Sequence, residues 1–109
     1  MGLKEQLWTI ERKSVPVVVG NGLTVFVRVL NGEEYDACQA EIDKRGAVSE
    51  RAVLISKTAC EDEKGEKLIF KAPEETAPIN TAVLQRLYFI ALKINGLTKE
   101  AREAYEKNC

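Results

Sequence analysis

The run from residue 79 to residue 97 is the longest apolar stretch with helical periodicity in this 109-residue chain. Pro78 precedes the run, where proline is compatible with a helix start. Asn95-Gly96 closes it, since Gly96 can adopt the left-handed conformation of a helix C-terminus. Its apolar residues recur at helical spacing over one wide face: Val83, Leu84, Leu87, Tyr88, Ile90, Ala91 and Ile94. Because so wide an apolar arc must be largely buried, the pattern predicts the central helix of a small domain.

Two β-branched runs, residues 15–19 and 23–30, flank a Gly20-Asn21-Gly22 turn and predict a β-hairpin. Pro16 cannot donate to a strand ladder, so the first strand is expected at a sheet edge. An open edge is a place where another chain can pair, and Pro16 is alternatively a guard against such pairing. On the second strand, Phe26 and Leu30 share a face that is only partly apolar.

Asn31 and Glu34 form a capping-box pattern, which predicts a helix that ends at Gly46. The carboxylates of this helix, Glu34 among them, are expected to be solvated. Ser49 is expected to cap a second helix over residues 50–60. The remaining segments are a lead-in that is either a short helix or extended (3–11), a charged turn (61–66), an apolar anchor (68–70), a proline-containing connector (72–78) and a last short helix (99–107).

These segments predict an α+β fold in which an N-terminal β-hairpin packs on a small, mostly helical bundle of about four helices. A chain of this length suits one modest hydrophobic core. We therefore expect a single domain over residues 1–109, with a lead-in (1–12), the hairpin (13–30) and a mainly helical part (31–109).

The chain has no histidine, so it lacks the commonest general acid/base and the commonest metal ligand. Its cysteines form no CxxC pair, and Cys38 and Cys60 are expected to be small core residues in a reducing compartment. The Gly20-x-Gly22 pattern leads into a strand rather than a helix, which is not a dinucleotide-binding loop. We predict a non-enzymatic protein with no catalytic residues, no cofactor and no metal site.

The charges are nearly balanced, with 16 basic and 17 acidic residues. Without a basic excess, nucleic acid is not an expected partner. No apolar run approaches the roughly 18–20 residues of a membrane-spanning helix, and the first residues lack a charged-then-apolar signal pattern. We therefore expect a cytoplasmic protein with no membrane partner.

Three stretches carry a family resemblance. Residues 25–34 (VFVRVLNGEE) read as a strand followed by a loop and a Gly-Glu helix start. Residues 51–70 combine a helix that begins with Arg, an acidic Gly turn and a Leu-Ile-Phe anchor, and residues 83–98 form a long helix ending in Asn-Gly-Leu. In this order, and with Glu-Lys-Asn at 106–108, residues 15–108 resemble the tail assembly chaperone family of long-tailed bacteriophages and prophages. The two prolines of residues 72–78 depart from the family pattern before the long helix.

The resemblance implies a non-enzymatic chaperone of the bacterial host cytoplasm that is absent from the mature virion. Its implied partners are the tape-measure protein, which it would coat, and tail-tube subunits, which it would recruit. Self-association is a further expectation. Many family members are made in two lengths by ribosomal frameshifting, and this chain would be the short form or the shared N-terminal domain.

A chaperone of this kind must cover apolar helical surface on its client, which favours a modest exposed apolar patch. The candidate partner-binding residues are Phe26 and Leu30 on the hairpin and Tyr88 and Phe89 on the long helix; the alternative is that all four belong to the core. Two other functions stay open. One is a structural tail or head-tail protein retained in the virion, and the other is a small regulator whose nucleic-acid binding is salt-sensitive.

Overall fold

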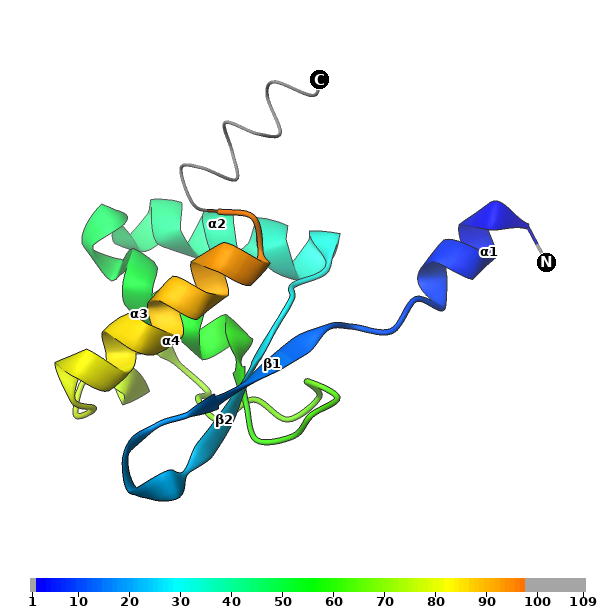
Figure 1. The fold of residues 1–109 in the computed structure, drawn as a ribbon. Helices are drawn as coiled ribbons and strands as arrows, with labels where there is room; N and C mark the ends of the chain where they lie inside the picture. Colours follow the sequence, from blue (N-terminus) through cyan, green and yellow to red (C-terminus); the bar gives the residue numbers. More distant parts are fainter. Residues whose placement is uncertain (1, 98–109) are drawn as a thin grey trace.

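The computed structural model describes residues 2–97 of the protein. Its body consists of three packed helices and a three-stranded antiparallel sheet, and a short N-terminal helix stands away from that body (Figure 1). The predicted α+β, mostly helical fold is confirmed. The last predicted helix, residues 99–107, lies outside the described residues, so three helices of the expected bundle are seen to pack.

The sheet begins with the predicted hairpin. Strands β1 (Ser14–Val18) and β2 (Thr24–Arg28) pair antiparallel, with Val17 opposite Val25. In the turn between them Asn21 has a φ of 64°, a left-handed conformation that asparagine adopts more readily than most residues. The Gly20-Asn21-Gly22 segment therefore forms the predicted hairpin turn.

A third strand, β3 (Ala59–Cys60), joins the sheet beside β2, giving the order β1-β2-β3. Ala59 pairs with Val27 and Cys60 with Phe26. The prediction that residues 59–60 end the second helix is therefore wrong. The second edge of β2 carries backbone groups that need partners, and pairing with residues 59–60 satisfies them. Such a non-local requirement leaves no mark on the local sequence pattern.

Helix α2 (Gly32–Arg45) starts with the predicted capping box. The backbone N–H of Glu34 donates to Asn31 Oδ1 at 2.8 Å, and the N–H of Asn31 donates to Glu34 Oε1 at 2.9 Å. Gly46, with a φ of 101°, ends the helix as predicted. The entry into α2 is therefore fixed by its own sequence.

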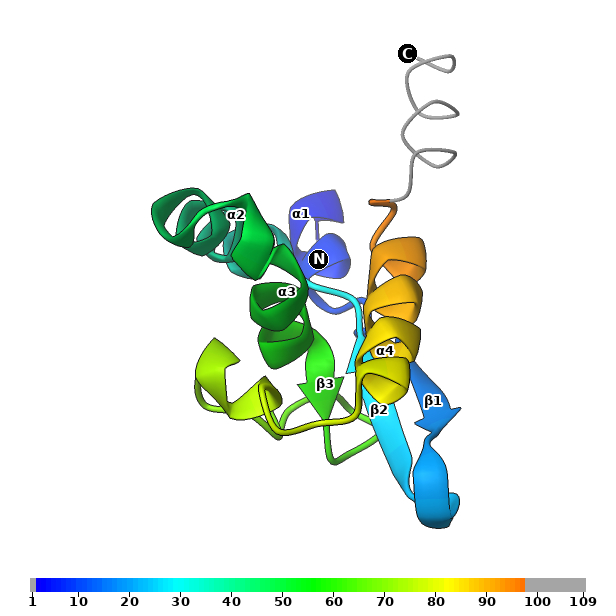
Figure 2. The same ribbon diagram turned by 90° about the vertical axis from the view of Figure 1, so that its left-hand side faces the viewer.

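Helix α3 (Glu50–Thr58) is the most buried helix, because Val53, Leu54 and Ile55 are each at most 2% exposed. It packs against α2, α4 and β2, and Figure 2 shows it between α2 and α4. Ser49 occupies the N-cap position as predicted, but its side chain does not cap the helix. Its backbone is already helical, and its hydroxyl donates to the carbonyl of Gly46 at 2.7 Å instead of capping α3.

Helix α4 (Thr81–Ile94) is the predicted long helix, but it starts at Thr81 because Asn80 caps it, with Asn80 Oδ1 accepting from the Ala82 N–H at 2.8 Å. Gly96 closes it with a φ of 67°. The prediction that α4 is central is wrong, since only one side of it is covered. Three of its residues are buried (Leu84, Leu87, Ala91), whereas its other side exposes Ala82, Gln85, Arg86, Phe89 and Lys93.

The core lies between the sheet and the helices. Val17 and Val27 contribute one face of the sheet, and they cluster with buried residues of α3 and α4. Cys38 and Cys60 are free and buried, as predicted, and burial raises the pKa of both thiols. They are therefore packing residues that remain protonated at neutral pH.

The acidic turn after β3 is held by the carboxylate of Asp62. Asp62 Oδ1 accepts hydrogen bonds from the N–H groups of Lys67 at 2.8 Å and Glu66 at 3.1 Å. The predicted anchor follows, with Leu68 forming a β-bridge to Cys60. Across the described part of the chain, no group of three or more His, Cys, Asp or Glu side chains could hold a metal ion. Nor is any helix there long and apolar enough to span a membrane.

Candidate partner-binding surface

A buried arginine joins four parts of the chain next to the N-terminal segment. Arg28, at the end of β2, is only 7% exposed. Its Nε donates to the carbonyl of Lys57 at 2.8 Å, and its Nη1 donates to the carbonyl of Gly65 at 3.0 Å. Its Nη2 lies 3.3 Å from Glu34 Oε2 at the start of α2. All the nitrogen atoms of the guanidinium therefore contact acceptors from α3, the acidic turn and α2.

Gly65 makes this arrangement possible. It has a φ of 72°, and a Cβ at this position would lie 3.1 Å from both the Cβ of Arg28 and the Cδ of Arg12. A side chain is therefore disfavoured on two grounds, the left-handed backbone and the close approach of both arginines.

Glu34 also anchors the lead-in segment. Arg12 Nη1 lies 2.9 Å from Glu34 Oε1, and Arg12 Nη2 donates to Glu34 Oε2 at 3.1 Å. Partial burial opposes ionisation of Glu34, but the hydrogen bond from Asn31 and the two arginines outweigh it and lower the pKa of this carboxyl. The expectation that Glu34 is fully solvated is wrong, because its side chain is only 26% exposed. It is an ionised link that fixes Arg12 to the body.

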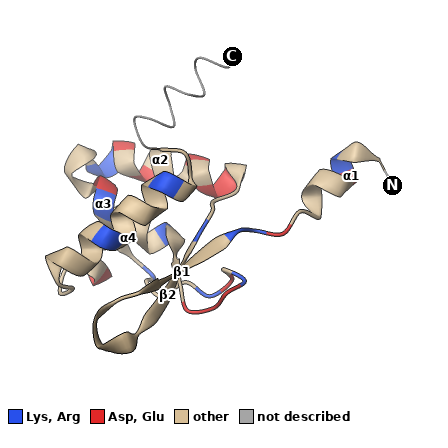
Figure 3. Ribbon diagram, viewed as in Figure 1, with Lys and Arg blue, Asp and Glu red and all other residues tan. Residues whose placement is uncertain are grey.

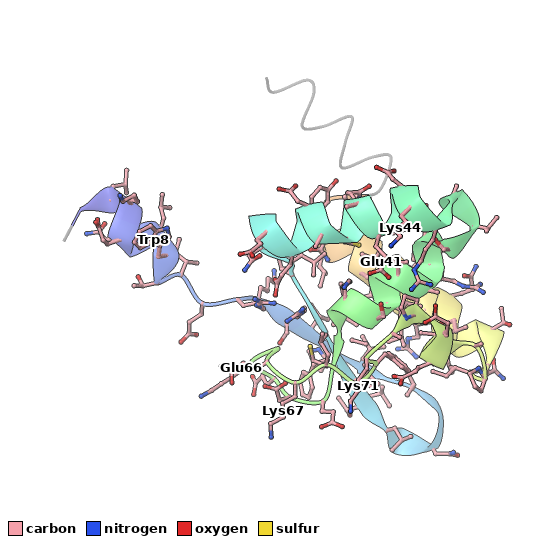
Figure 4. The ribbon with its side chains drawn as sticks, turned by 180° about the vertical axis from the view of Figure 1, so that it is seen from behind. Trp8, Glu41, Lys44, Glu66, Lys67 and Lys71 are labelled. Atoms are coloured by element: carbon pink, nitrogen blue, oxygen red, sulfur yellow. The ribbon has the colours of Figure 1, made fainter. Side chains whose placement is uncertain are left out.

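Residues 2–11, which we call the α1 arm, extend outward from this anchor. The arm contains helix α1 (Leu3–Trp8), of which none of the six described residues is buried. Figure 1 shows α1 standing away from the body, and Figure 4 shows Trp8 far from the labelled body residues. Its large apolar side chains are mostly in solvent: Leu3 is 73% exposed, Leu7 58%, Trp8 72% and Ile10 70%.

So many exposed apolar side chains on one short segment indicate an interaction surface. An isolated helix shorter than about 12–15 residues is marginal in water, and α1 has six. Lys4 Nζ lies 5.3 Å from the centre of the Trp8 ring, a local cation–π contact that leaves the Leu3–Leu7 side uncovered. The arm therefore combines a polar contact within itself with an apolar side that has no cover in the described chain.

The four sequence-predicted binding residues do not form one surface. Leu30 is only 8% exposed and belongs to the core, so a partner does not reach it in this structure. Phe26 is partly buried on β2, where it alternates with the core residue Val27 and so points to the opposite face of the sheet from α4. On α4, Tyr88 is partly buried and Phe89 is 67% exposed. Partner binding by Phe26, Tyr88 and Phe89 stays a prediction.

Pro16 guards the open edge of β1 against pairing with another strand, which is the second of the two roles considered for it. The N–H of Val29 donates to the Lys13 carbonyl, and the N–H of Val19 donates to the Leu23 carbonyl. The backbone N–H and C=O groups of the odd-numbered residues of β1 therefore point toward β2, and those of the even-numbered residues point away from it. Pro16 therefore faces the open edge, where it removes a donor that another strand would need. Strand addition at this edge is disfavoured, which leaves side-chain surfaces as the better docking sites.

The charges of α2 do not form a face of one sign. Figure 3 shows acidic and basic residues interspersed along α2. Several are already paired: Arg45 contacts Glu41 and Glu74, and Lys57 Nζ lies 3.5 Å from Glu41 Oε1. This pattern is typical of a solvated surface, whereas phosphate-backbone binding needs a face of one sign.

Comparison with solved structures identifies the fold. The chain shares its fold with the tail assembly chaperone of bacteriophage HK97. The match has a TM-score of 0.59 and 22% sequence identity, and it covers 83% of this chain and 94% of that one. No family model matches the chain, and no curated protein sequence matches it. The likeness concerns the arrangement of the elements, and it agrees with the resemblance noted in the order of the sequence motifs.

Sequence reasoning did not single out the α1 arm as a binding surface. The signal was present, since Leu3, Leu7 and Ile10 recur at helical spacing and Trp8 is the only tryptophan of the chain. What the sequence could not show is that the body has no place for these residues. Exposure is a property of the whole fold, and a six-residue helix with an apolar side looks the same whether it is covered or bare.

Proposed function

We propose that this protein is a non-enzymatic tail assembly chaperone of a long-tailed phage or prophage. In this role it acts in the bacterial cytoplasm, binds the tape-measure protein, recruits tail-tube subunits and is left out of the finished virion. The observation that carries the proposal is the fold shared with the HK97 tail assembly chaperone over 83% of the chain. The sequence motifs, which point to the same family without any use of the fold, support it independently.

The exposed apolar side chains suit such a role. A client with long amphipathic helices presents apolar stripes, and a chaperone needs matching apolar residues on accessible elements. Phe89 provides one on the outer side of α4, flanked by the exposed Gln85, Arg86 and Lys93. An aromatic residue surrounded by polar ones resembles an anchor with a solvated rim, the usual arrangement at a reversible interface.

The main competing function is a structural protein of the tail or head-tail region, and the location of the protein separates the two. The chain is quantified by mass spectrometry in purified phage particles and in the lysate that produced them. The proposal predicts that it is abundant in the lysate and absent from particles, and that deleting its gene stops tail formation. A fixed number of copies in each particle would reject the chaperone role.

A nucleic-acid-binding regulator is tested separately. DNA binding measured by fluorescence anisotropy at low and high salt would be strong and salt-dependent for a regulator. The proposal predicts no binding at physiological salt.

A further inference from the structure

The charges of α4 differ from those of α2. Helix α4 contains Arg86 and Lys93 but neither aspartate nor glutamate, and the sequence has no acidic residue between Glu75 and Glu100. Figure 3 accordingly shows blue segments and no red ones on α4. Helix α2, on the other side of α3, carries both signs with an acidic excess (Figure 2). The body therefore has a basic side on α4 and a more acidic side on α2.

The basic side chains of α4 have no counter-charge in the described chain. Arg86 and Lys93 are exposed, and neither forms an ion pair among residues 2–97. Arg51 of α3 reaches the same helix, where its Nη1 donates to the neutral amide oxygen of Gln85 at 3.0 Å. Three cations therefore lie on or next to α4 without an acidic partner in the described residues.

The two carboxylates that precede α4 in the chain are bound elsewhere. Glu74 forms an ion pair with Arg45 at the end of α2. Glu75 Oε1 accepts a hydrogen bond from the backbone N–H of Lys71 at 2.7 Å. Both acids are therefore held by contacts outside α4, and they leave the positive charge of its outer side in place.

An exposed phenylalanine lies between the two cations of α4. At about 100° per residue, Ala82, Arg86, Phe89 and Lys93 form one line along the helix, on the side away from its buried residues. We call these four residues the α4 stripe. It is roughly 16 Å long at about 1.5 Å per residue, and Phe89 within it is 67% exposed. The α4 stripe thus combines an apolar centre with a cation on each side.

The α4 stripe stands on a helix that is held at both ends. At the start, Asn80 Oδ1 accepts from the N–H of Ala82 at 2.8 Å. At the end, Asn95 Nδ2 donates to the carbonyl of Ala91 at 2.9 Å, and Asn95 Oδ1 accepts the N–H of Leu30 at 2.8 Å. A partner therefore meets an ordered surface, which lowers the entropic cost of association.

We propose that the α4 stripe binds an amphipathic helix of the client whose apolar residues are bordered by aspartates or glutamates. This inference rests on the proposed function and adds to it the chemistry of the client segment. The apolar residues of the client cover Phe89, and its carboxylates face Arg86 and Lys93, whose aliphatic stems extend the apolar contact. A helix bordered by lysines places like charges opposite each other, which opposes binding.

Two other occupants suit the α4 stripe less well. A nucleic acid is held through phosphate contacts to many cations, and an exposed aromatic side chain between two cations adds little to such contacts. A second copy of the chain would have to offer its acidic helix α2, whose exposed apolar residues are only Ala37 and Ala40. These alanines give Phe89 little to pack against. An acidic amphipathic helix matches both the charges and the aromatic ring.

Titration of two synthetic peptides into the isotope-labelled full chain, followed by NMR of its backbone amides, tests the proposal. Both peptides form amphipathic helices of about 20 residues with the same leucine stripe, bordered by glutamates in one and by lysines in the other. We expect the glutamate peptide to shift the amide signals of residues 82–93 and to bind at least about tenfold more tightly than the lysine peptide. Its affinity should fall with added salt, because exposed charges distinguish the two peptides.

Reversal of the charges on α4 gives the decisive comparison. The double variant Arg86→Glu with Lys93→Glu should prefer the lysine peptide. The matched control is Lys44→Glu with Lys67→Glu, which makes the same change of net charge at exposed residues of α2 and after the acidic turn (Figure 4). Lys93 and Lys44 both lie in the last turn of their helices, so the two variants are also matched in their effect on helix stability. The control should keep the preference for the glutamate peptide, and circular dichroism checks that both variants remain folded.

The proposal is overturned if the glutamate peptide does not bind α4, if both peptides bind equally, or if the control variant changes the preference as much as the α4 variant. It is also overturned if DNA at physiological salt, or a second copy of the chain, shifts the same amide signals. The chaperone role is judged separately by the location of the protein. A chain that binds neither peptide but is absent from particles would reject the charge-matched surface and leave the role intact, whereas a chain that prefers the glutamate peptide but is present in particles would reject only the role.

Discussion

Replacement of Arg28 by methionine tests the buried link between β2, α2, α3 and the acidic turn. Methionine keeps much of the aliphatic length of arginine but removes every donor. The carbonyls of Lys57 and Gly65 then lose their hydrogen bonds from Arg28, and Glu34 loses one of its two arginine contacts.

The size of the effect follows from these contacts. Leaving a buried acceptor without a donor costs about 1–3 kcal/mol, and breaking a buried ion pair costs about 3–5 kcal/mol. Two factors reduce the total: Glu34 keeps Arg12 and is 26% exposed, and removing Arg28 also removes the cost of burying its charge. We therefore expect a loss of about 3 kcal/mol, a large part of the roughly 5–15 kcal/mol that stabilises a small domain.

Urea unfolding followed by circular dichroism measures this loss as a shift of the midpoint. Arg51→Met is the matched control, because Arg51 makes an exposed hydrogen bond to Gln85 at 3.0 Å and should cost about 0.5 kcal/mol or less. The reasoning is refuted if Arg28→Met destabilises the protein by less than about 1 kcal/mol more than Arg51→Met, a difference below the cost of one unsatisfied buried acceptor.

Three further predictions concern the backbone at Gly65, the pH dependence of stability through Glu34, and the exposed side chain of Phe89. Gly65→Ala should destabilise the protein by about 1–3 kcal/mol, and by more than Gly22→Ala in urea unfolding, because both glycines have a φ of 72° but a Cβ meets the arginines only at Gly65. Equal losses would show that the close approach has no cost. The pKa of Glu34 is lowered in the folded state, so the stability that its carboxylate contributes is complete above the ordinary pKa of a glutamate and is lost as pH falls through the folded value. Glu34→Gln should therefore make the urea midpoint fall less steeply with acid. A pH profile identical to that of the wild type would contradict this role of Glu34. Phe89→Asp should change the urea midpoint by about 0.5 kcal/mol or less, because the side chain is 67% exposed, and should weaken capture of a tail client; a large loss of stability would place Phe89 in the core instead.

The elements that sequence predicted well are those that local chemistry determines. The capping box of Asn31 and Glu34 involves neighbouring residues, and Gly46 and Gly96 end helices through their own backbone freedom. Alternating β-branched residues around Asn21 likewise determine the hairpin. In each case the groups that interact lie within a few residues of one another, so their spacing in the sequence is also their spacing in space.

The errors arise where a distant segment decides the outcome. Residues 59–60 leave the helix because β2 offers an unpaired edge, and α4 is half exposed because α3 occupies the centre of the body. Glu34 is only partly solvated because Arg12 and Arg28 reach it from separate segments. The number of apolar residues in a helix shows how much surface would be favourable to bury, but the arrangement of neighbouring elements decides how much is buried.

The exposure of the candidate partner-binding residues also depends partly on local pattern and partly on distant segments. Phe89 was a candidate for partner binding with a core position as the alternative, and it is exposed. Leu30 was grouped with Phe26 by strand alternation, but the strand ends at Arg28 and the chain then turns inward, where Asn95 Oδ1 accepts the N–H of Leu30 at 2.8 Å. The exposed α1 arm emerges only when the body is seen to leave it uncovered.

The most direct test of the proposed chaperone role is co-purification with a defined client. The tagged chain is co-expressed with the tape-measure protein encoded in its own gene cluster, and the complex is captured and analysed by size-exclusion chromatography with light scattering. The account predicts a stable soluble complex with several copies of the chain on each tape-measure protein, weakened by Phe89→Asp and retained by Val48→Asp. A tape-measure protein that remains insoluble and unbound in the presence of the folded chain would contradict it.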